Sequence, residues 1–432
     1  MKRLLTTVLT LGLFINAHSQ GIIVNDSAQT GVSSSQMTFY SLATGTKTVV
    51  QNDDWHLAIS IRPSLYPETP LGGTTIRHNG QLGTRVYYVP NARAATFSSL
   101  DTTGWHSWKR LYDSDTSVDE GCLNSNRNLG YFYDFGWGVY NPNSHNVVGD
   151  SLYLIQLPDG QLKKFIVVNL AYDTAYNIKY ANIDNSDSVM LHFSKRDYIG
   201  KEFVYLNLSN NQVMDKEPLS SDWDLQFLKY QATDVLNNQH VPIVGVWQNE
   251  GTLTAKRDGH DIGSNDYSNL SFSHYLNAIG WNWKYPGNIM SLLAGKNILD
   301  NLEFYLTRDS LAYFVQTRQG EVYKLVFTKY VISSGQINFF TQKLTTTGIV
   351  EAGQNSDILS VYPNPASSTV NVTTALPSAT LRIVDITGRI VHEEVTTGNP
   401  TPINTSDYPN GMYLLMVSGE GKTSVRKFEV SR

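Results

Sequence analysis

The sequence predicts an all-β protein made of two related β-rich modules and a small β-sandwich at the C-terminus. The clearest observation is a hairpin pattern that occurs twice, at residues 150–172 and again at residues 309–330. Each copy begins Asp-Ser-Leu, alternates apolar residues over several positions, turns at Gly160 or Gly320, and then runs apolar again. Alternation with a period of two predicts strands, and almost no stretch of the first module keeps a helical period for more than two turns.

A second matched pair lies upstream of the two hairpins. Residues 40–59 contain LATG followed by DDWHLAI, and residues 205–227 contain LSNN followed by SDWDLQF. Because several elements repeat in the same order, we infer that whole modules are duplicated. We expect a first module at residues 36–190 and a diverged second module at residues 191–350.

The N-terminus has the pattern of a secretory signal peptide. Lys2 and Arg3 precede an almost uninterrupted apolar run, which ends at small residues before Gln20. The run of about 12 residues is too short to cross a bilayer, and no later segment approaches the roughly 20 residues required. We expect residues 1–19 to be removed, residues 20–35 to form a flexible leader, and the mature chain to be soluble outside the cytoplasm.

The composition excludes several classes of function. The 432 residues carry a net charge of −5 and only 16% of them are charged, so the chain lacks the basic face with which nucleic-acid-binding proteins displace counterions. Cys122 is the single cysteine, which excludes a disulfide framework and a lipid-bearing cysteine at the mature N-terminus. We interpret Cys122 as a buried thiol.

The first module is expected to consist of short strands. Residues 40–50 predict two strands around a Thr-Gly pair, since glycine allows the positive φ of a tight turn. From Trp55 to Ile61 the apolar residues alternate, which predicts a half-buried strand with its tryptophan toward the core. Residues 136–140 precede a turn at an Asn-Pro-Asn tripeptide, and the first hairpin closes the module.

The chain changes character over residues 351–432. This part contains YPNPA at 362–366, a strand-turn-strand unit at 381–391, an Asn-Gly turn that opens a strand at 410–413, and a final strand at 427–430. The alternation predicts a small β-sandwich. The four blocks, in this order, resemble the type A C-terminal sorting domain of the Bacteroidetes type IX secretion system. The resemblance implies transport across the outer membrane by the type IX secretion machinery, and a final place on the cell surface or in the medium.

Six blocks of the first module also occur together in a known family. In order they are DDWHLAI, TTIRHNG, TFSSLD, GWGVYNPNSHNV, SLYLIQLPDGQLKKF and YNIKY, within residues 39–183. This series resembles the HmuY family of bacterial haem-binding proteins, and the second module repeats it more loosely through SDWDLQF and GWNWKY. The resemblance implies haem as the cofactor and handover of haem to an outer-membrane receptor.

Haem capture requires nitrogen or sulfur ligands on loops above an apolar, aromatic pocket. The residues of this type are His78, His106 and His145 in the first module, and His240, His260, His274 and Met290 in the second. We take His145, His106, His274 and Met290 as candidate axial ligands, with His145 foremost because it follows the Gly-Trp pair at residues 136–137. For each histidine, a surface or turn residue without a ligand is the more common alternative.

Two further motifs have simpler interpretations. Residues 149–152 match the GDSL motif of serine esterases, but Ser151 enters an alternating strand and no later D-x-x-H motif follows to supply a base. The acidic run at residues 113–119 has Val118 where a calcium loop needs glycine. We therefore interpret the first as a turn before a strand and the second as a solvated loop.

Together these observations predict a non-enzymatic binding protein of the cell surface or the medium, which binds haem or a related tetrapyrrole. Family members known for haem capture are typically lipoproteins with one module, whereas this chain has two modules, no lipidated cysteine and a sorting domain. The alternative is a structural or adhesive surface protein that contacts protein or glycan without haem. Aromatic clusters at residues 105–108 and 281–285 fit either hypothesis, although such rings more often fill a core.

Overall fold

The computed structural model describes residues 19–63, 72–91, 94–234, 239–259, 262–286, 305–345, 359–374, 378–385, 389–396, 400–419 and 422–432. The predicted signal peptide lies outside these ranges up to residue 18. The described fold is all-β, as predicted, and its helices are short 3₁₀ turns. None of the helices found in these ranges is long and apolar enough to cross a membrane. Residues 20–344 form one compact unit, and residues 345–432 belong to another.

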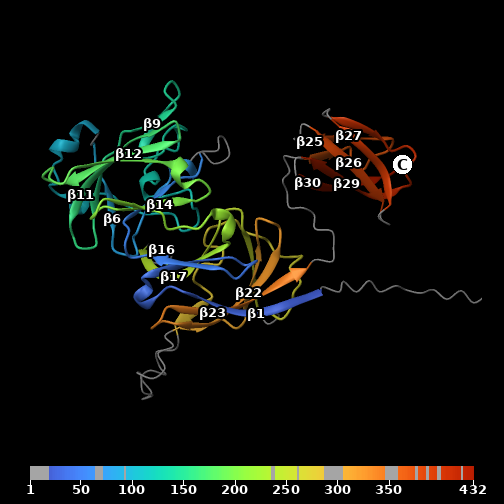
Figure 1. The fold of residues 1–432 in the computed structure, drawn as a ribbon, viewed down its shortest axis with the longest axis horizontal. Coiled ribbons are helices and arrows are strands. Elements are labelled where there is room, and N and C mark those ends of the chain that lie inside the picture. Colours follow the sequence, from blue (N-terminus) through green and yellow to red (C-terminus); the bar gives the residue numbers. More distant parts are fainter. Residues whose placement is uncertain are drawn as a thin grey trace, which may run out of the picture. The chain divides into compact units, whose positions relative to one another are not determined.

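The largest sheet of the first module is antiparallel. Its strands are β6 (Arg85–Tyr88), β7 (Arg110–Leu111), β8 (Gly138–Asn141), β9 (Asn146–Gly149), β10 (Tyr153–Gln156), β11 (Leu162–Ala171), β12 (Ala175–Asn182) and β13 (Val189–Ser194). They follow the order β13-β12-β11-β10-β6-β7, and the β8–β9 hairpin joins the sheet through β11 (Figure 1). Strands β10 and β11 are the first of the two predicted hairpins.

A smaller sheet packs against the large one. It consists of β4 (Leu57–Ser60), β5 (Ile76–His78), β14 (Phe203–Asn207) and β15 (Gln212–Met214), in the order β15-β14-β4-β5. Leu57 and Ile59 of β4 enter a core with Tyr153 and Phe165 of the large sheet. The prediction of a half-buried strand at β4 was wrong, because all four of its residues are buried. Its second face packs against residues of the other module rather than facing water.

The second module has the same plan. One sheet has the order β1-β23-β22-β21-β18, another has the order β17-β16-β2-β3, and β19 pairs with β20. The strands are β1 (Ser19–Gln29), β2 (Gln36–Tyr40), β3 (Lys47–Gln51), β16 (Leu225–Asp234), β17 (Gln239–Gln248), β18 (Leu253–Asp258), β19 (Lys284–Pro286), β20 (Tyr305–Thr307), β21 (Leu311–Gln316), β22 (Val322–Val331) and β23 (Gln336–Thr345). Its core includes Phe227, Tyr313, Phe327 and Phe339.

The two hairpins that reveal the duplication share fine details of geometry. Strand β11 has a bulge between Val167 and Asn169, and β22 has a bulge between Phe327 and Lys329. Both bulges lie at the same distance along the chain from the hairpin glycine. In addition, the first tyrosine of each hairpin donates its hydroxyl hydrogen bond to a backbone carbonyl in the loop before β8 or β19. The local structure therefore repeats down to individual hydrogen bonds.

In each module, one hairpin pairs with a strand of the other module. The β2–β3 hairpin precedes β4 in the chain but pairs with β16, with Phe39 opposite Gln226. Its counterpart, the β14–β15 hairpin, precedes β16 but pairs with β4, with Tyr205 opposite Ala58. A division of the chain at residue 190 would therefore separate both hairpins from the strands with which they pair.

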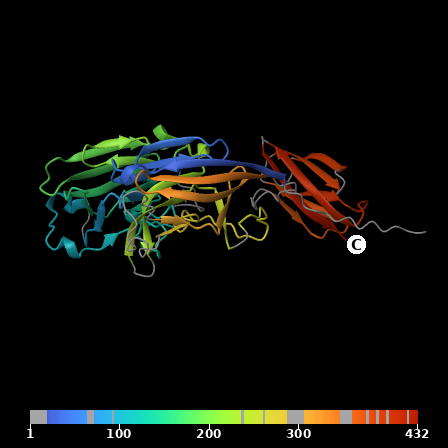
Figure 2. The same ribbon diagram turned by 90° about the horizontal axis from the view of Figure 1, so that it is seen from below.

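The N-terminal segment is also part of this fold. We predicted a flexible leader at residues 20–35, and this was wrong, because β1 pairs with β23 at the edge of a sheet. The blue first strand runs beside the orange strands in both views (Figures 1 and 2). Thr30 then donates its backbone N–H to Gly335 at 2.9 Å. The β-branched run Ile22-Ile23-Val24 within β1 was a strand signal that the polar residues after it obscured.

The C-terminal unit is a small antiparallel β-sandwich, as predicted. Its strands are β24 (Leu359–Tyr362), β25 (Thr369–Thr374), β26 (Ala379–Asp385), β27 (Ile390–Thr396), β28 (Thr401–Asn404), β29 (Gly411–Gly419) and β30 (Lys422–Val430). They form two sheets, β24-β25-β28 and β27-β26-β29-β30. Val370, Leu381, Leu415 and Phe428 are among the residues of its own core.

Candidate functional site

The turn of the β8–β9 hairpin and the turn between β11 and β12 frame a hollow with a volume of about 510 Å³. Its aromatic lining consists of Phe132, Tyr133, Phe135, Tyr140 and Tyr172, and His145 stands among them. We call this site the aromatic hollow. Most of these residues come from loops, which a rigid sheet positions for contact with a ligand.

The backbone at the aromatic hollow is strained. His145, Tyr172 and Asp173 have φ values of 54°, 48° and 53°, a left-handed conformation that side chains other than Gly, Asn and Asp seldom adopt. The equivalent turn of the second module, between β22 and β23, relies instead on Gly335 with φ 70°. Residues in this conformation cost stability, are held by the surrounding structure, and are enriched at functional sites.

His145 is exposed and only one of its ring nitrogens has a partner in the described structure. Its Nδ1 lies 2.8 Å from the hydroxyl of Tyr140. When Nδ1 carries the proton and donates it to that hydroxyl, Nε2 presents its lone pair. The ring therefore has the orientation and the free nitrogen of a ligand residue.

The charges at the edge of the hollow are paired. Asp173 accepts a hydrogen bond from Lys195 Nζ at 2.5 Å, and the same ammonium donates to the carbonyl of Gly73 at 2.9 Å. Burial lowers the pKa of Lys195, and Asp173 opposes this effect. Since the carboxylate of Asp173 is held by a buried lysine, the apolar and phenolic side chains dominate the surface of the hollow.

The other predicted ligands lie elsewhere. His106 is exposed on the 3₁₀ turn Trp105–Ser107 and stacks on Trp105 with ring centroids 3.9 Å apart. His274 is exposed and leans on the ring of Tyr275. Neither lines the aromatic hollow. Met290 and His260 lie outside the described residues.

Met290 does occupy a notable place in the chain order. It belongs to the connection between β19 and β20, just as His145 belongs to the connection between β8 and β9. The two hairpins are equivalent in the duplicated modules.

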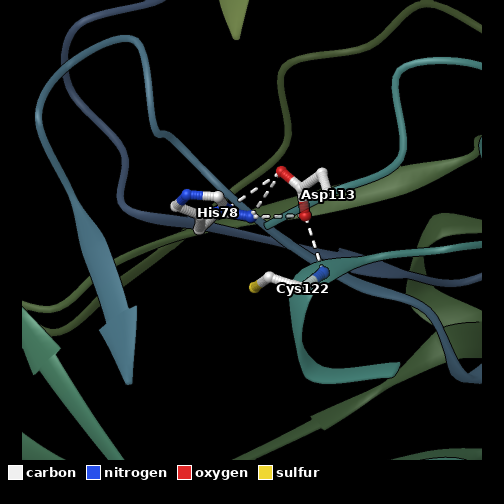
Figure 3. A group of neighbouring side chains, drawn as sticks. All are labelled: His78, Asp113 and Cys122. Atoms are coloured by element: carbon white, nitrogen blue, oxygen red, sulfur yellow. Dashed lines mark hydrogen bonds and ion pairs between the residues drawn. The ribbon is translucent and has the colours of Figure 1, made fainter. Parts of the chain in front are cut away.

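Two other histidines are held by structural contacts. His240 stacks on Tyr112 with ring centroids 3.6 Å apart. His78 is buried, and its Nδ1 lies 3.0 Å from Asp113 Oδ2 (Figure 3). The same carboxylate accepts the backbone N–H of Cys122 at 2.7 Å.

The cluster of His78, Asp113 and Cys122 brings potential ligand atoms within 4.8 Å of one another, but it does not fit a metal ion. Both oxygens of Asp113 already accept hydrogen bonds from the imidazole and from backbone N–H groups. Burial raises the pKa of the Cys122 thiol well above its ordinary value, and the thiol contacts the carbonyl of Ile76. Metal ligation requires a thiolate, so we interpret the cluster as a set of hydrogen bonds that stabilise the local fold.

The residues of the remaining motifs make structural contacts within the protein. Ser151 lies directly before β10 and donates to the carboxylate of Asp150 at 2.8 Å. In the acidic run, Asp115 accepts the backbone N–H of Thr233, and Asp119 pairs with Arg62. These carboxylates therefore face protein groups rather than one central point.

The aromatic clusters divide between core and surface. Trp105 and Trp108 pack against a core cluster that includes Tyr87 and Phe97. Trp283 is fully buried, whereas Trp281 is 40% exposed. The aromatic residues that form the hollow, such as Phe132 and Tyr172, were not among the sequence candidates. The only signal that could have found them is the dense aromatic run YFYDF at residues 131–135.

Comparison with known proteins defines the class of the protein at its C-terminus. Residues 360–431 match the secretion system C-terminal sorting domain. The chain is therefore exported by type IX secretion to the cell surface or into the medium. No curated protein matches the chain.

A search of solved structures gives a weaker likeness, to PorZ of Porphyromonas gingivalis, described as an essential bacterial surface component of the type IX secretion system. The sequence identity is 15%, the match covers 68% of this chain and 41% of that chain, and the TM-score is 0.16. This chain thus spans less than half of the length of PorZ. A TM-score this low supports no statement about the function of this chain.

Proposed function

We propose that this exported protein binds haem or a related tetrapyrrole in the aromatic hollow, with His145 as an axial ligand. The observation that carries the proposal is the hollow itself, in which five aromatic rings surround an exposed histidine with a free ring nitrogen. The role is binding, without a catalytic step. The sequence resemblance of the first module to the HmuY family supports the same ligand.

The residues present fit the chemistry of the ligand. A tetrapyrrole is flat and apolar, and aromatic rings favour such a surface through stacked or edge contacts. Its iron takes an imidazole nitrogen as an axial ligand and also accepts a tyrosine oxygen. His145 would supply the first, and the exposed Tyr172 or Tyr133 would supply the second. Iron bound in this way gives the haem a characteristic absorption.

The position of the hollow suits transfer of the cargo. Tyr172 is 65% exposed, so a ligand on this ring would remain accessible from outside the protein. A partner that carries haem inward, such as an outer-membrane receptor, could then contact the ligand without unfolding either sheet. The remaining role of the protein is to hold the ring and exclude water from one face of it.

The test is a titration of the purified mature chain with haemin. We expect a sharp Soret band that saturates at one haem per chain and is lost in His145→Ala. His106→Ala is the matched control, because His106 is equally exposed but lies outside the hollow. A spectrum indistinguishable from that of free haemin would exclude the haem proposal. Loss of the Soret band in His106→Ala alone would identify His106, and not His145, as the ligand.

A second candidate is adhesion to protein or glycan without haem. It is favoured by apolar exposure beside the hollow, where Leu129, Tyr131 and Phe132 are 82%, 47% and 53% exposed. Exposed aromatic patches of this kind mark contact surfaces. Binding of the chain to cell-surface glycans or proteins that is lost in Tyr131→Ala, together with an unchanged haemin spectrum, would favour this function.

A further inference from the structure

A second cavity lies between the two modules and is independent of the aromatic hollow. Its volume is about 70 Å³. Residues of both modules line it. They include His78 at the end of β5 and Asn79 directly after it, Trp223 before β16, Gln231 within β16, and Gln248 at the end of β17. We call it the inter-module cavity.

Unpartnered polar atoms are concentrated at this cavity. The buried side-chain atoms of its lining that have no hydrogen-bond partner among the described residues include His78 Nε2, Asn79 Oδ1, Gln231 Oε1, Gln248 Oε1 and Trp223 Nε1. The side chains of His78, Asn79, Trp223 and Gln248 are all more than nine-tenths buried. Folded proteins satisfy nearly all such groups, so their accumulation around one space indicates missing partners.

The orientations of three of these groups are fixed by their other contacts. Asn79 Nδ2 donates to the carbonyls of Asn52 at 2.9 Å and Trp55 at 3.0 Å, which leaves Oδ1 as the free atom. Gln248 Nε2 donates to the carbonyl of Ser273 at 3.0 Å. The carboxylate of Asp113 accepts a hydrogen bond from Nδ1 of His78, which leaves Nε2 as the ring nitrogen at the cavity (Figure 3). Rotation of the side-chain amide of Asn79 or of Gln248 by 180° would break a hydrogen bond that the amide already makes.

Glycine keeps part of this space open. A Cβ on Gly80 would lie 2.4 Å from Gln231 Oε1 and 2.8 Å from His78 Nε2. Two polar side-chain atoms therefore converge beside a residue without a side chain. A small polar molecule between them can form a hydrogen bond with each.

The size and charge of the cavity limit what it can hold. One water molecule needs at least about 10–15 Å³ of cavity volume. The inter-module cavity, with about 70 Å³, therefore takes about five water molecules or one polar molecule as large as that cluster. Carboxylates outnumber cations in the lining, with Asp113, Glu202, Glu217 and Glu250 against Arg77 and Lys229. An anion is therefore disfavoured, and the fixed acceptors Asn79 Oδ1 and Gln248 Oε1 call for a ligand with N–H or O–H groups.

We propose that the inter-module cavity is a permanent binding site for small hydrogen-bond-donating molecules, neutral or cationic, which join the two modules. The occupant is either a cluster of ordered waters or one small polar compound such as an amine or an amide. Bridging hydrogen bonds of this kind are nearly as favourable as direct ones, so a filled cavity satisfies the interface.

The direct test is a crystal structure of the mature chain at a resolution that shows ordered water. We expect electron density within hydrogen-bond distance of His78 Nε2, Gln231 Oε1 and Trp223 Nε1. Mass spectrometry of the supernatant after heat denaturation then separates the two occupants, since only a polar compound is released with a defined mass. An empty cavity, or side chains that bond one another across it, would overturn the proposal.

Variants give a second, independent measurement. Gly80→Ala should remove the density between His78 and Gln231 and lower the melting temperature. Gly263→Ala is the matched control, because a Cβ there meets nothing within 4 Å. Trp223→Phe deletes one donor and should lose the density beside it. If both cavity variants left the density and the melting temperature unchanged, the molecules would not be held as proposed.

Discussion

At the scale of single residues, the aromatic hollow combines exposed aromatic side chains with residues in the left-handed backbone conformation. Tyr172 is a bulky residue in the left-handed region, directly before Asp173 in the same conformation. The second module makes the equivalent turn with a glycine, so the strain belongs to the first module alone. A residue that costs stability but faces a ligand is typical of a functional site.

The first prediction concerns this strain. Tyr172→Asn should raise the free energy of unfolding by about 1 kcal/mol, because Asn tolerates the left-handed conformation better than an aromatic residue. The same change should weaken haemin binding by removing a ring from the hollow. Urea unfolding and haemin titration measure the two effects. Asn211→Gly is the control, since Asn211 already suits its φ of 62° and should change little.

A second prediction at this scale concerns a buried carboxyl group. Glu217 accepts hydrogen bonds from the backbone N–H groups of Glu202 and Phe203 and from the hydroxyl of Tyr205. Burial, together with the nearby charge of Glu202, raises the pKa of Glu217 to about 7. Its folded form therefore binds a proton that the unfolded chain releases near its ordinary pKa of 4.5.

The stability that this group contributes is present below pH 4.5 and is lost as the pH rises to about 7. We expect the slope from Glu217 to approach about 1.4 kcal/mol per pH unit within that window. Glu217→Gln should flatten the slope and should be relatively more stable than the wild type above pH 7. Chemical unfolding at several pH values between 4 and 8 gives the comparison. Parallel curves for both proteins would show that the pKa of Glu217 is not raised.

At the scale of elements, duplication leaves equivalent positions with different chemistry. The first residue pair of the β8–β9 hairpin is Gly138 with Gly149, and the corresponding first pair of β19 and β20 is Lys284 with Thr307. The side chain of Lys284 is buried, with its ammonium 4.3 Å from the ring centre of Trp283 and close to the rings of Tyr305 and Tyr330. It donates to the carbonyl of Val244. Strand β19 of the second module therefore carries a buried lysine that is surrounded by aromatic rings.

The third prediction follows from that position. Burial lowers the pKa of Lys284 to about 7, against 10.5 for the ordinary side chain. Between these values the unfolded chain binds more protons, so stability should rise with pH over this window. Lys284→Met keeps the apolar stem and should remove the rise. Thermal unfolding between pH 7 and 10 measures it, and an unchanged pH profile in the variant would assign the rise to other groups.

At the scale of the whole molecule, the exchange of hairpins makes residues 20–344 one folding unit. Strand β4 lies between β14 and β5, and β16 lies between β2 and β17. Trp55 and Trp223 meet in the cluster that both exchanged hairpins help to form. Neither module can complete its smaller sheet from its own continuous sequence.

The fourth prediction tests this dependence. A fragment of residues 20–200 retains β2–β3 and β4 but lacks β14–β15, so it leaves β4 with an open edge. We expect it to associate as a dimer through exchange of the β2–β3 hairpin, or to remain largely unfolded. Light scattering and amide NMR spectra distinguish these states from the monomeric fragment 20–344. A well-folded monomer of residues 20–200 would show that the exchange is dispensable.

The sequence by itself determined the features that depend on local pattern. Period-two alternation around Gly160 and Gly320 located both hairpins, and the motif blocks at 362–366 and 410–413 identified the sorting domain, because side-chain direction along a strand follows directly from residue order. These signals need only a few consecutive residues, so they can be read without the fold.

Only the tertiary structure decided which strands pair and which side chains meet. Nothing in the local sequence shows that β14 completes the sheet of β4, or that β1 pairs with β23, because backbone pairing between distant strands leaves little trace in composition. The same holds for Tyr172 beside His145 and for His78 opposite Gln231. Loops and edges from separate parts of the chain create both sites, so the choice of partners is a property of the folded molecule.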